Sequence, residues 1–193
     1  MLHTILPTQM QAAEQTAFAA GLSPLLTMET AARAAFDVLL DLLGCDCRGK
    51  NVLFLCGPGN NGGDGLVMAR LLLQARGFAR IILLDMPKTA EAQINLRHLQ
   101  AMGADIEAVP DELLEDEYDA VVDALFGTGF TGSIAADSPA GRLLTWANTC
   151  GPMLSIDVPS GMDAATGAVE GVCARAIWTV TFHRPKPGLY LTE

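Results

Sequence analysis

Apolar residues recur along this chain in two different periods, and their order predicts an α/β fold. Short, nearly continuous apolar runs that end in glycine or aspartate are typical of buried strands, and they are listed here by position: 52–56, 80–85, 106–109, 119–126, 153–158 and 176–182. Between them, apolar residues recur at helical spacing, from Leu66 onward and over 89–102 and 138–148. Strands that alternate with helices predict a parallel sheet covered on both faces.

Two further helices are predicted before the first strand. Thr8 can cap a helix that continues to about Ala20, and a second helix covers about 25–43. Gly21 and Gly44 should end them. The first helix carries a stripe that we expect to be buried against the sheet or a partner subunit, and it consists of Met10, Ala13, Ala17 and Phe18.

The stretch after the first strand, GPGNNGGDG, organises the rest of the chain. A strand, a glycine turn and a helix form the first half of a βαβ unit, where backbone can approach a ligand closely. Gly57, Gly59 and Gly62 fit the dinucleotide fingerprint, with Asp85 ending the next strand. Asp64 argues against that interpretation, because its charge near the helix N-terminus would repel a pyrophosphate. A carboxylate there suits a cation or ligand hydroxyls, or simply caps the helix.

Composition narrows the classes of function. The chain has 193 residues, half of them hydrophobic, which predicts one domain with a sizeable core. A net charge of -10 argues against binding to nucleic acid or to an anionic membrane surface. No apolar run reaches membrane-spanning length, and no signal-peptide pattern is present. The five cysteines are dispersed, with Cys45 and Cys47 the one close pair, which indicates buried thiols in a reducing compartment. We therefore expect a cytoplasmic protein.

Three loops follow strands in the same sense, at 57–64, 127–132 and 159–161, and should meet at one crevice. Asp123 lies in an apolar strand, where a carboxylate is costly unless it is paired or bound. It either accepts amides of its own turn or, beside asparagine and serine oxygens, binds an alkali or alkaline-earth cation. Spacing alone leaves both interpretations open.

Asp157 precedes a proline-serine-glycine turn, which would hold its carboxylate at the crevice. It suits a general base or a hydroxyl-binding group, and the alternative is a turn cap. His183 and Lys186 follow the last strand in HRPKPGL. Lys186 could reach an anionic ligand, but a lysine in a proline-rich segment is usually exposed and solvated. His3 and His98 are assigned no role.

Four segments resemble, in this order and spacing, the NAD(P)H-hydrate epimerases, the family of YjeF N-terminal domains: GPGNNGGDGLVMAR, VVDALFGTGF, SIDVPSGMDAATG and TVTFHRPKPGL. The opening LPTQMQAAEQ…GLSPLLTMETAARA is similar to that family's first helices. The resemblance implies a Rossmann-like three-layer αβα sandwich with a mostly parallel sheet, preceded by two helices, as a single domain over 1–193. It also implies a homodimer.

The activity that the resemblance implies is metabolite repair. Members interconvert the R and S forms of hydrated NADH and NADPH (NADHX and NADPHX), which carry a hydroxyl at C6 of the nicotinamide ring. An S-specific, ADP- or ATP-dependent dehydratase then restores the cofactor. Inversion requires either that hydroxide leaves or that the ring opens and recloses, and the sequence does not decide between them.

Site residues follow from the same motifs. By resemblance, Asn61, Asp123 and Ser160 would hold a potassium ion, and either Asp157 or Asp64 would be the acid-base, with Asp157 favoured. The expected substrate contacts are Asn60, Asn61, Gly62, Gly63, Asp64, Gly127, Thr128, Gly129, Phe130, Thr131, Gly132, Ser133 and Asp157.

Two departures from the family pattern qualify these expectations. The segment SIAADSP is neutral until Asp137, where the family usually has a charged residue, so part of the substrate contact differs. The chain also stops at Glu193, before the family's usual last strand and any dehydratase domain. We therefore expect a C-terminally shortened domain or the first part of a longer bifunctional protein.

Two other classes of function compete with the epimerase. A non-catalytic scaffold is one, because the fold also resembles the dimerisation domain of an enhancer-of-decapping protein. A complete polar crevice with Asn61, Asp64, Asp123 and Asp157 argues against it. A NAD-dependent dehydrogenase is the other, but it needs an acid-base or substrate-anchoring group for hydride transfer that the sequence does not offer.

Overall fold

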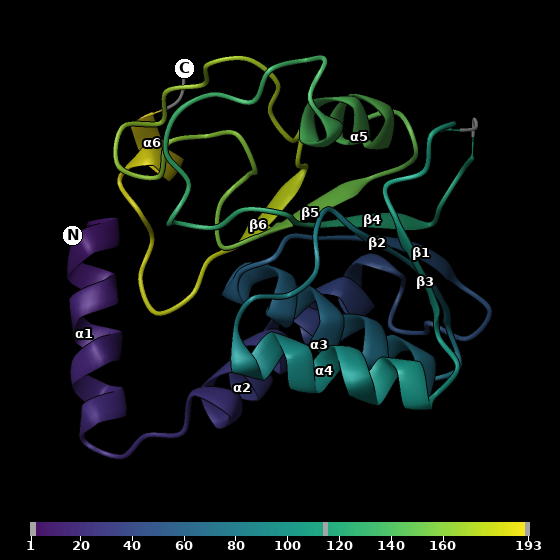
Figure 1. Cartoon of the computed structure of the whole chain (residues 1–193), viewed down its shortest axis with the longest axis horizontal. Coiled ribbons are helices and arrows are strands. Elements are labelled where there is room, and N and C mark those ends of the chain that lie inside the picture. The colour runs from purple at the N-terminus through teal and green to yellow at the C-terminus, as the bar shows by residue number, and fades with distance from the viewer. Residues whose placement is uncertain (1–2, 114–115, 192–193) are drawn as a thin grey trace.

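The computed structural model describes residues 3–113 and 116–191 (Figure 1). Within them, a six-stranded sheet has the order β3-β2-β1-β4-β5-β6, and neighbouring strands run parallel throughout. This confirms the predicted parallel sheet. The strands are β1 (Asn51–Cys56), β2 (Phe78–Leu83), β3 (Asp105–Ala108), β4 (Ala120–Ala124), β5 (Met153–Ile156) and β6 (Trp178–Val180).

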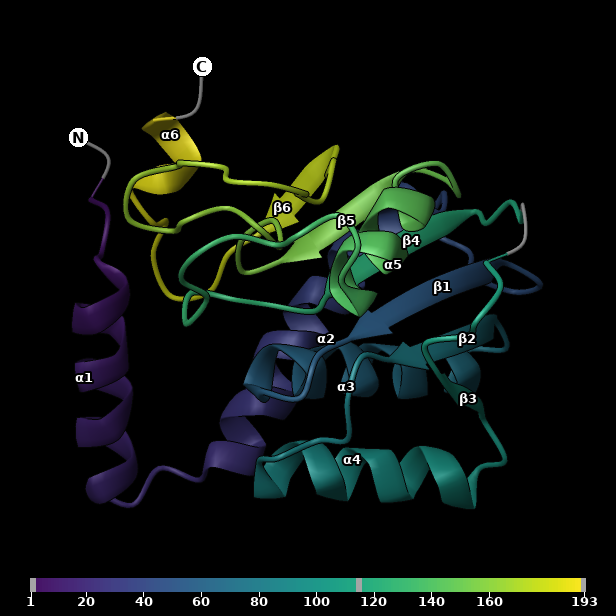
Figure 2. The same ribbon diagram turned by 45° about the horizontal axis from the view of Figure 1, so that its top comes forward.

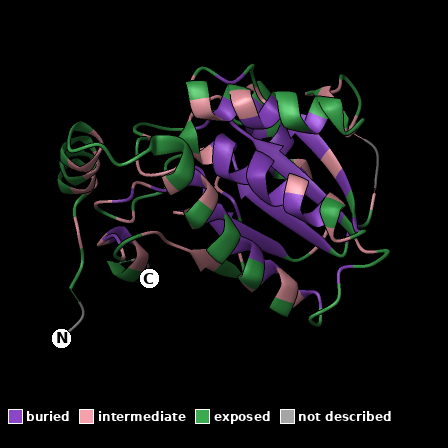
Figure 3. Cartoon of the chain, turned by 90° about the horizontal axis from the view of Figure 1, so that it is seen from below, coloured by how far each residue is buried: buried purple, intermediate pink, exposed green. Residues whose placement is uncertain are grey.

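Helices cover both faces of the sheet and complete the three layers. α2 (Pro24–Leu42), α3 (Asn60–Gln74) and α4 (Ala90–Ala101) lie on one face, and α5 (Pro139–Ala147) lies on the other (Figures 1 and 2). Alternate residues of β1 serve the two sides: Val52 and Phe54 join the core beneath α2 and α3, whereas Leu53 and Leu55 join the core beneath α5. Buried positions accordingly run along the central strands (Figure 3).

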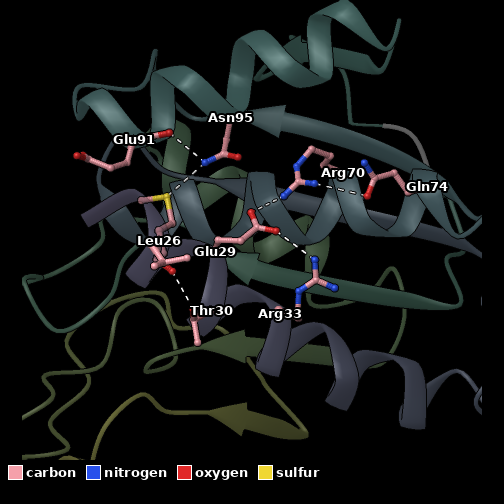
Figure 4. Close-up of polar contacts among 9 residues, drawn as sticks. Leu26, Glu29, Thr30, Arg33, Arg70, Gln74, Glu91 and Asn95 are labelled. Atoms are coloured by element: carbon pink, nitrogen blue, oxygen red, sulfur yellow. Dashed lines mark hydrogen bonds and ion pairs between the residues drawn. The ribbon is translucent and has the colours of Figure 1, made fainter. Parts of the chain in front are cut away.

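Polar side chains on the first face join α2 to its neighbours. Glu29 of α2 pairs with Arg70 of α3 and, at 3.3 Å, with Arg33 of its own helix (Figure 4). The buried Asn95 of α4 donates to the Met28 sulfur of α2 at 3.5 Å. These contacts fix α2, α3 and α4 as one layer.

α1 (Pro7–Ala19) does not pack against the sheet, which was one of the two predicted alternatives, and packing against a partner subunit stays a prediction. None of its residues is buried, and the helix stands apart from the sheet (Figures 1 and 2). The predicted apolar stripe exists, but all of its members line a cavity instead of a packed neighbour. The cap is also different, because the helix begins at Pro7 after Leu6 and not at Thr8. Gly21 and Gly44 end the two helices at φ of 101° and 80°, as predicted.

The helix after β1 starts earlier than the spacing of its apolar residues suggests. α3 begins at Asn60, so most of the glycine-rich stretch is helical and Asp64 lies past its first turn. Close packing explains these glycines: a Cβ on Gly62 would lie 1.8 Å from the Gly57 carbonyl oxygen, and one on Gly63 would lie 2.5 Å from the end of Met28. Glycine is poor in helices, but here no side chain fits.

A short helix, α6 (Gly188–Leu191), follows the last strand and was not predicted. Across the described residues, no helix combines the length and apolar character needed to cross a membrane.

Candidate active site at the carboxyl ends of β1, β4 and β5

The loops after β1 and β4 touch at the point where the strand order reverses. β1 and β4 are neighbours, with β2 and β5 on their outer sides. The Gly57 amide donates to the Ala124 carbonyl at 3.0 Å, and a Cβ on Gly57 would lie 1.8 Å from the Leu125 carbonyl oxygen. In parallel α/β sheets this reversal point opens a crevice at the carboxyl ends of the strands. Gly127 lies beside Asn61, and the Phe126 amide donates to Ser160 Oγ at 2.9 Å, so the three predicted loops do meet here.

Asp123 is fully buried at this point and accepts hydrogen bonds on both oxygens. Oδ2 accepts from Ser155 Oγ at 2.7 Å and from the Ser160 amide at 2.9 Å. Oδ1 accepts from Ser160 Oγ at 2.6 Å and from the Leu125 amide at 3.3 Å. Asp123 therefore ties the β4 loop to the turn after β5, and the predicted bond to its own turn is present.

Burial raises the pKa of Asp123, and its hydrogen bonds from Ser160, Ser155 and the Leu125 amide oppose that rise. Ser160 Oγ also accepts from the Phe126 amide at 2.9 Å. Four donors surround this carboxylate, so a cation bound to it would take the place of at least one of them. Asp123 is consequently a structural centre of the crevice whatever else binds there.

Asp157 follows β5 and holds an unusual backbone conformation. Its φ is 69°, a left-handed value that costs a non-glycine residue on the order of 1 kcal/mol. Its Oδ2 accepts from the Thr128 amide at 3.2 Å, so the loop after β4 and the turn after β5 meet through this carboxylate. Such strain persists where the surroundings over-determine a geometry, which is common at functional sites.

Lys186 was expected to be exposed and solvated, and this expectation was wrong. It is fully buried, and its ammonium forms an ion pair with Oδ1 of Asp157. It also donates at 3.0 Å to Thr181 Oγ1 and at 3.0 Å to the Phe182 carbonyl. The chain turns around it, with His183 at φ 62°. The sequence could not show this pairing, since the two partners are 29 positions apart.

Asn61 lies across Gly127 from Asp157. A Cβ on Gly127 would be 3.2 Å from Asn61 Oδ1 and 3.2 Å from Asp157 Oδ2, so a side chain there would crowd both. The Asn61 Nδ2 is buried and has no acceptor among the residues that the structure describes. Buried polar atoms nearly always have a hydrogen-bond partner, so this nitrogen is an exception.

Asp64 is a second carboxyl group at the crevice, with surroundings unlike those of Asp123. It is 8% exposed, and in the described part of the chain its carboxyl accepts no hydrogen bond. Burial raises its pKa well above the usual value, and the charges of Asp157 and Glu14 raise it further. Burial, together with the charge of Asp157, also raises the pKa of Glu14, which projects from α1. Sequence reasoning missed Glu14, because no local motif marks it.

A cavity of about 750 Å³ adjoins this group of carboxyls. Apolar residues of α1 and α2 form much of its wall, and Asn60 and Asp64 of α3 contribute polar atoms. Thr181, which donates weakly to Asp157 Oδ1 at 3.4 Å, also lines it. The cavity has the size of ligand pockets, with polar groups set among a largely apolar lining.

The remaining predicted substrate contacts fall into two groups. In the loop after β4, Phe130 packs against Phe126 with ring centroids 5.1 Å apart, and the neighbouring residues Gly129, Thr131, Gly132 and Ser133 are exposed. Gly62 and Gly63 are buried by helix packing, as described above. Substrate contact by these residues stays a prediction. Within 3–113 and 116–191, no three His, Cys, Asp or Glu side chains are grouped to hold a metal.

The fold and the crevice define a class: a Rossmann-like α/β protein with buried carboxyls at its strand-order reversal. A crystal structure of yeast ynu0, YNL200c, has the same fold, with a TM-score of 0.84 at 21% identity, covering all of this chain and 85% of that one. The family model of the YjeF-related protein N-terminus matches residues 26–188. The chain belongs to this family, which confirms the resemblance stated above.

Curated relatives give the same picture. A bifunctional NAD(P)H-hydrate repair enzyme Nnr of Methanothermobacter thermautotrophicus is 38% identical over 97% of this chain, which covers 37% of that protein. A protein named NAD(P)H-hydrate epimerase, from Nitrosopumilus maritimus, is 36% identical over 84% of this chain and 76% of its own length. The chain thus spans about a third of the length of the bifunctional relatives.

Proposed function

We propose that this protein is an isomerase that interconverts the R and S forms of NADH and NADPH hydrate at C6 of the nicotinamide ring. The observation that carries the proposal is Asp157, a strained carboxylate at the sheet's ligand crevice with one oxygen next to Gly127 and Asn61. The names of the relatives supply the substrate. A binding scaffold of the same fold has no use for such a group.

The chemistry requires a group that moves a proton at the C6 substituent. If hydroxide leaves, the C6–O bond breaks with a proton supplied to the oxygen, and water returns to the other face with a proton removed. If the ring opens, the C6–N bond breaks to an aldehyde and re-forms on the other face. We assign this proton transfer to Asp157, with Asp64 as a second carboxyl whose raised pKa favours its protonated form.

Labelled water separates the two routes. Epimerisation in H₂¹⁸O incorporates solvent oxygen at C6 in every turnover if hydroxide leaves, whereas ring opening and closure keep the original oxygen unless the aldehyde exchanges. Mass spectrometry of the hydrate at low conversion measures the difference.

The remaining predicted substrate contacts belong to the same proposal. The amides and glycines of 60–64 and 127–133 would bind the hydrate around Asp157. The nearby cavity, with its apolar walls, suits an aromatic ring of the substrate. No residue beyond these is assigned to binding.

A potassium ion is part of the proposal, held by Asn61, Asp123 and Ser160. Carboxylate, amide and hydroxyl oxygens suit a hard cation. Exchanging the oxygen and nitrogen of the Asn61 amide would put its oxygen, which can bind a cation, at the buried position that has no partner now. When bound, the ion would add positive charge to the crevice. Its test is replacement of potassium by a tetraalkylammonium salt at equal ionic strength, which should lower the rate and leave thermal stability nearly unchanged. Equal rates in both salts would contradict it.

Partners follow from the same activity. The longer relatives are named bifunctional NAD(P)H-hydrate repair enzymes, and we infer that the partner in this repair is a dehydratase that consumes the S form. We also infer a homodimer, supported by apolar side chains left exposed at the start of α2, such as Leu22 and Leu26. Light scattering of the purified protein tests the dimer. The unpaired cysteines support a cytoplasmic location.

The experiment that tests the activity starts with mixed R and S hydrates of NADPH. An S-specific dehydratase first consumes the S form, and this protein is then added. The remaining R form should disappear faster than in a blank. If R persists while the protein is folded, the chain is not an epimerase on its own and the scaffold function gains support.

A further inference from the structure

The Lys186 ammonium is saturated inside the protein. A lysine ammonium has three N–H donors, and this one has three acceptors: Asp157 Oδ1, Thr181 Oγ1 and the Phe182 carbonyl. Its side chain has no exposed surface. With no donor left over, Lys186 cannot bind a ligand directly, so any effect on the reaction must act through the groups it holds.

The group it holds is the Asp157 carboxylate. Lys186 takes Oδ1, and this leaves Oδ2 to the Thr128 amide and to the space beside Gly127 and Asn61. A buried lysine is an expensive way to fill space, because an apolar side chain of the same volume would pack without desolvating a charge. The pair therefore calls for an explanation other than stability.

We propose that Lys186 is the positioning residue of this site: its ammonium holds one oxygen of Asp157, so that the other faces the crevice. This inference rests on the proposed function for its effect on turnover, but not for its effect on geometry. Without Lys186, the Asp157 carboxylate loses its fixed partner and is free to turn away from Thr128. The loss should appear in the chemical step and not in substrate binding.

The test is Lys186→Met, which removes the charge and nearly keeps the volume. The matched control is Lys50→Met, since Lys50 pairs with Asp119 at 2.8 Å next to the amino end of β1, at the opposite edge of the sheet. We expect kcat of R-hydrate epimerisation to fall roughly 100-fold in Lys186→Met with KM nearly unchanged, because small displacements of a catalytic group cost about that much. Lys50→Met should keep wild-type kcat.

A rescue experiment separates positioning from packing. In Lys186→Ala, propylammonium matches the three carbons and the ammonium that were removed and supplies the missing donors, so it should restore part of kcat, while propanol should not. Restoration by neither compound, together with wild-type kcat in Lys186→Met, would overturn the proposal.

A spectroscopic readout works even if the protein proves inactive. The Thr128 amide donates to Asp157 Oδ2, so its NMR resonance reports the carboxylate's position. Lys186→Met should shift it by an amount comparable to Asp157→Asn, and Lys50→Met should not. If wild-type protein does not epimerise, the proposed function fails, and this resonance alone decides the role of Lys186. An unshifted Thr128 in folded Lys186→Met overturns that role.

Should Lys186→Met not fold, Thr181→Val weakens the hold on both members of the pair without leaving a charge unpaired. It removes one acceptor of the ammonium and the weak Thr181 donor to Asp157 Oδ1. The Thr128 resonance should then move in the same direction by a smaller amount, and an unmoved resonance counts against the proposal.

Discussion

Two buried aspartates of the crevice have opposite surroundings, and this decides what each can do. Asp123 accepts four hydrogen bonds and joins the loops after β4 and β5. Asp64 is nearly as buried, but it accepts none from the described residues and lines the cavity. A carboxyl without donors favours its neutral form, which can give a proton. Asp123 is therefore suited to joining the loops and to the proposed cation site, and Asp64 is suited to proton transfer or ligand binding.

The raised pKa of Asp64 predicts a pH-dependent stability. Because the folded state binds this proton more tightly than the unfolded chain, stability falls as pH rises from the unfolded pKa of about 4 to the folded pKa. Asp64→Asn removes that loss. Its free energy of unfolding should match the wild type at the acidic end and exceed it increasingly toward neutral pH.

Urea unfolding at a series of pH values measures this difference. Asp105→Asn, at an exposed aspartate where β3 begins, is the matched control. A constant difference between Asp64→Asn and the wild type across the series would show that Asp64 does not have a raised pKa.

Removing the Asp123 carboxylate should destabilise the fold strongly. Asp123→Ala leaves the Ser155 hydroxyl and the Ser160 and Leu125 amides without their acceptor, each buried. We expect a loss of about 3 kcal/mol or more in the free energy of unfolding. Asp119→Ala breaks a partly exposed pair with Lys50 and leaves the exposed Asn51 amide to solvent, and it should cost about 1 kcal/mol or less. Urea unfolding compares them, and equal losses would contradict the central structural role of Asp123.

The sequence predicted the order of the helices and strands, and which segments are helix or strand, better than it predicted where each one begins and ends. Each predicted strand is present, because continuous apolar runs such as that of β1 can be buried on both faces only in a covered parallel sheet. The start of α3 was missed, since glycine weakens the helical signal and only tertiary contact with Gly57 and Met28 requires it. α6 has four residues, which is too few for a helical repeat of apolar residues to be recognised in the sequence.

The glycines of α3 give a sharp comparison. Gly62→Ala should force the helix away from the Gly57 carbonyl, 1.8 Å from the new carbon, and cost about 3 kcal/mol. Gly59→Ala, only three residues earlier, faces open space and should cost within about 1 kcal/mol. Thermal and urea unfolding of the two variants test this. Similar stabilities would show that the first turn of α3 can shift freely.

In the whole molecule, local sequence patterns failed to predict how far α1 and Lys186 are buried. The apolar stripe of α1 predicted burial, yet the helix meets the rest of the chain across a cavity, tied by the Ile5 amide to the Pro185 carbonyl at 3.0 Å. Lys186 looked solvated between two prolines, yet the fold closes around it. Asp123 and Asp157, in contrast, were found from the sequence, because acids at the ends of apolar strands converge on one edge of a parallel sheet. Contacts between distant segments, which no local period encodes, account for the misses.

The central claim is that the Asp157 carboxylate epimerises hydrated NAD(P)H, and one comparison tests it most directly. Asp157→Asn and the control Asp105→Asn are assayed on R-NADPH hydrate with excess S-specific dehydratase, after both are shown to be folded. Asp157→Asn should lose about 100-fold or more of the wild-type rate, as expected for removal of an acid-base group, while Asp105→Asn should keep it. A folded Asp157→Asn that consumes the R form at the wild-type rate would show that Asp157 does not carry the reaction.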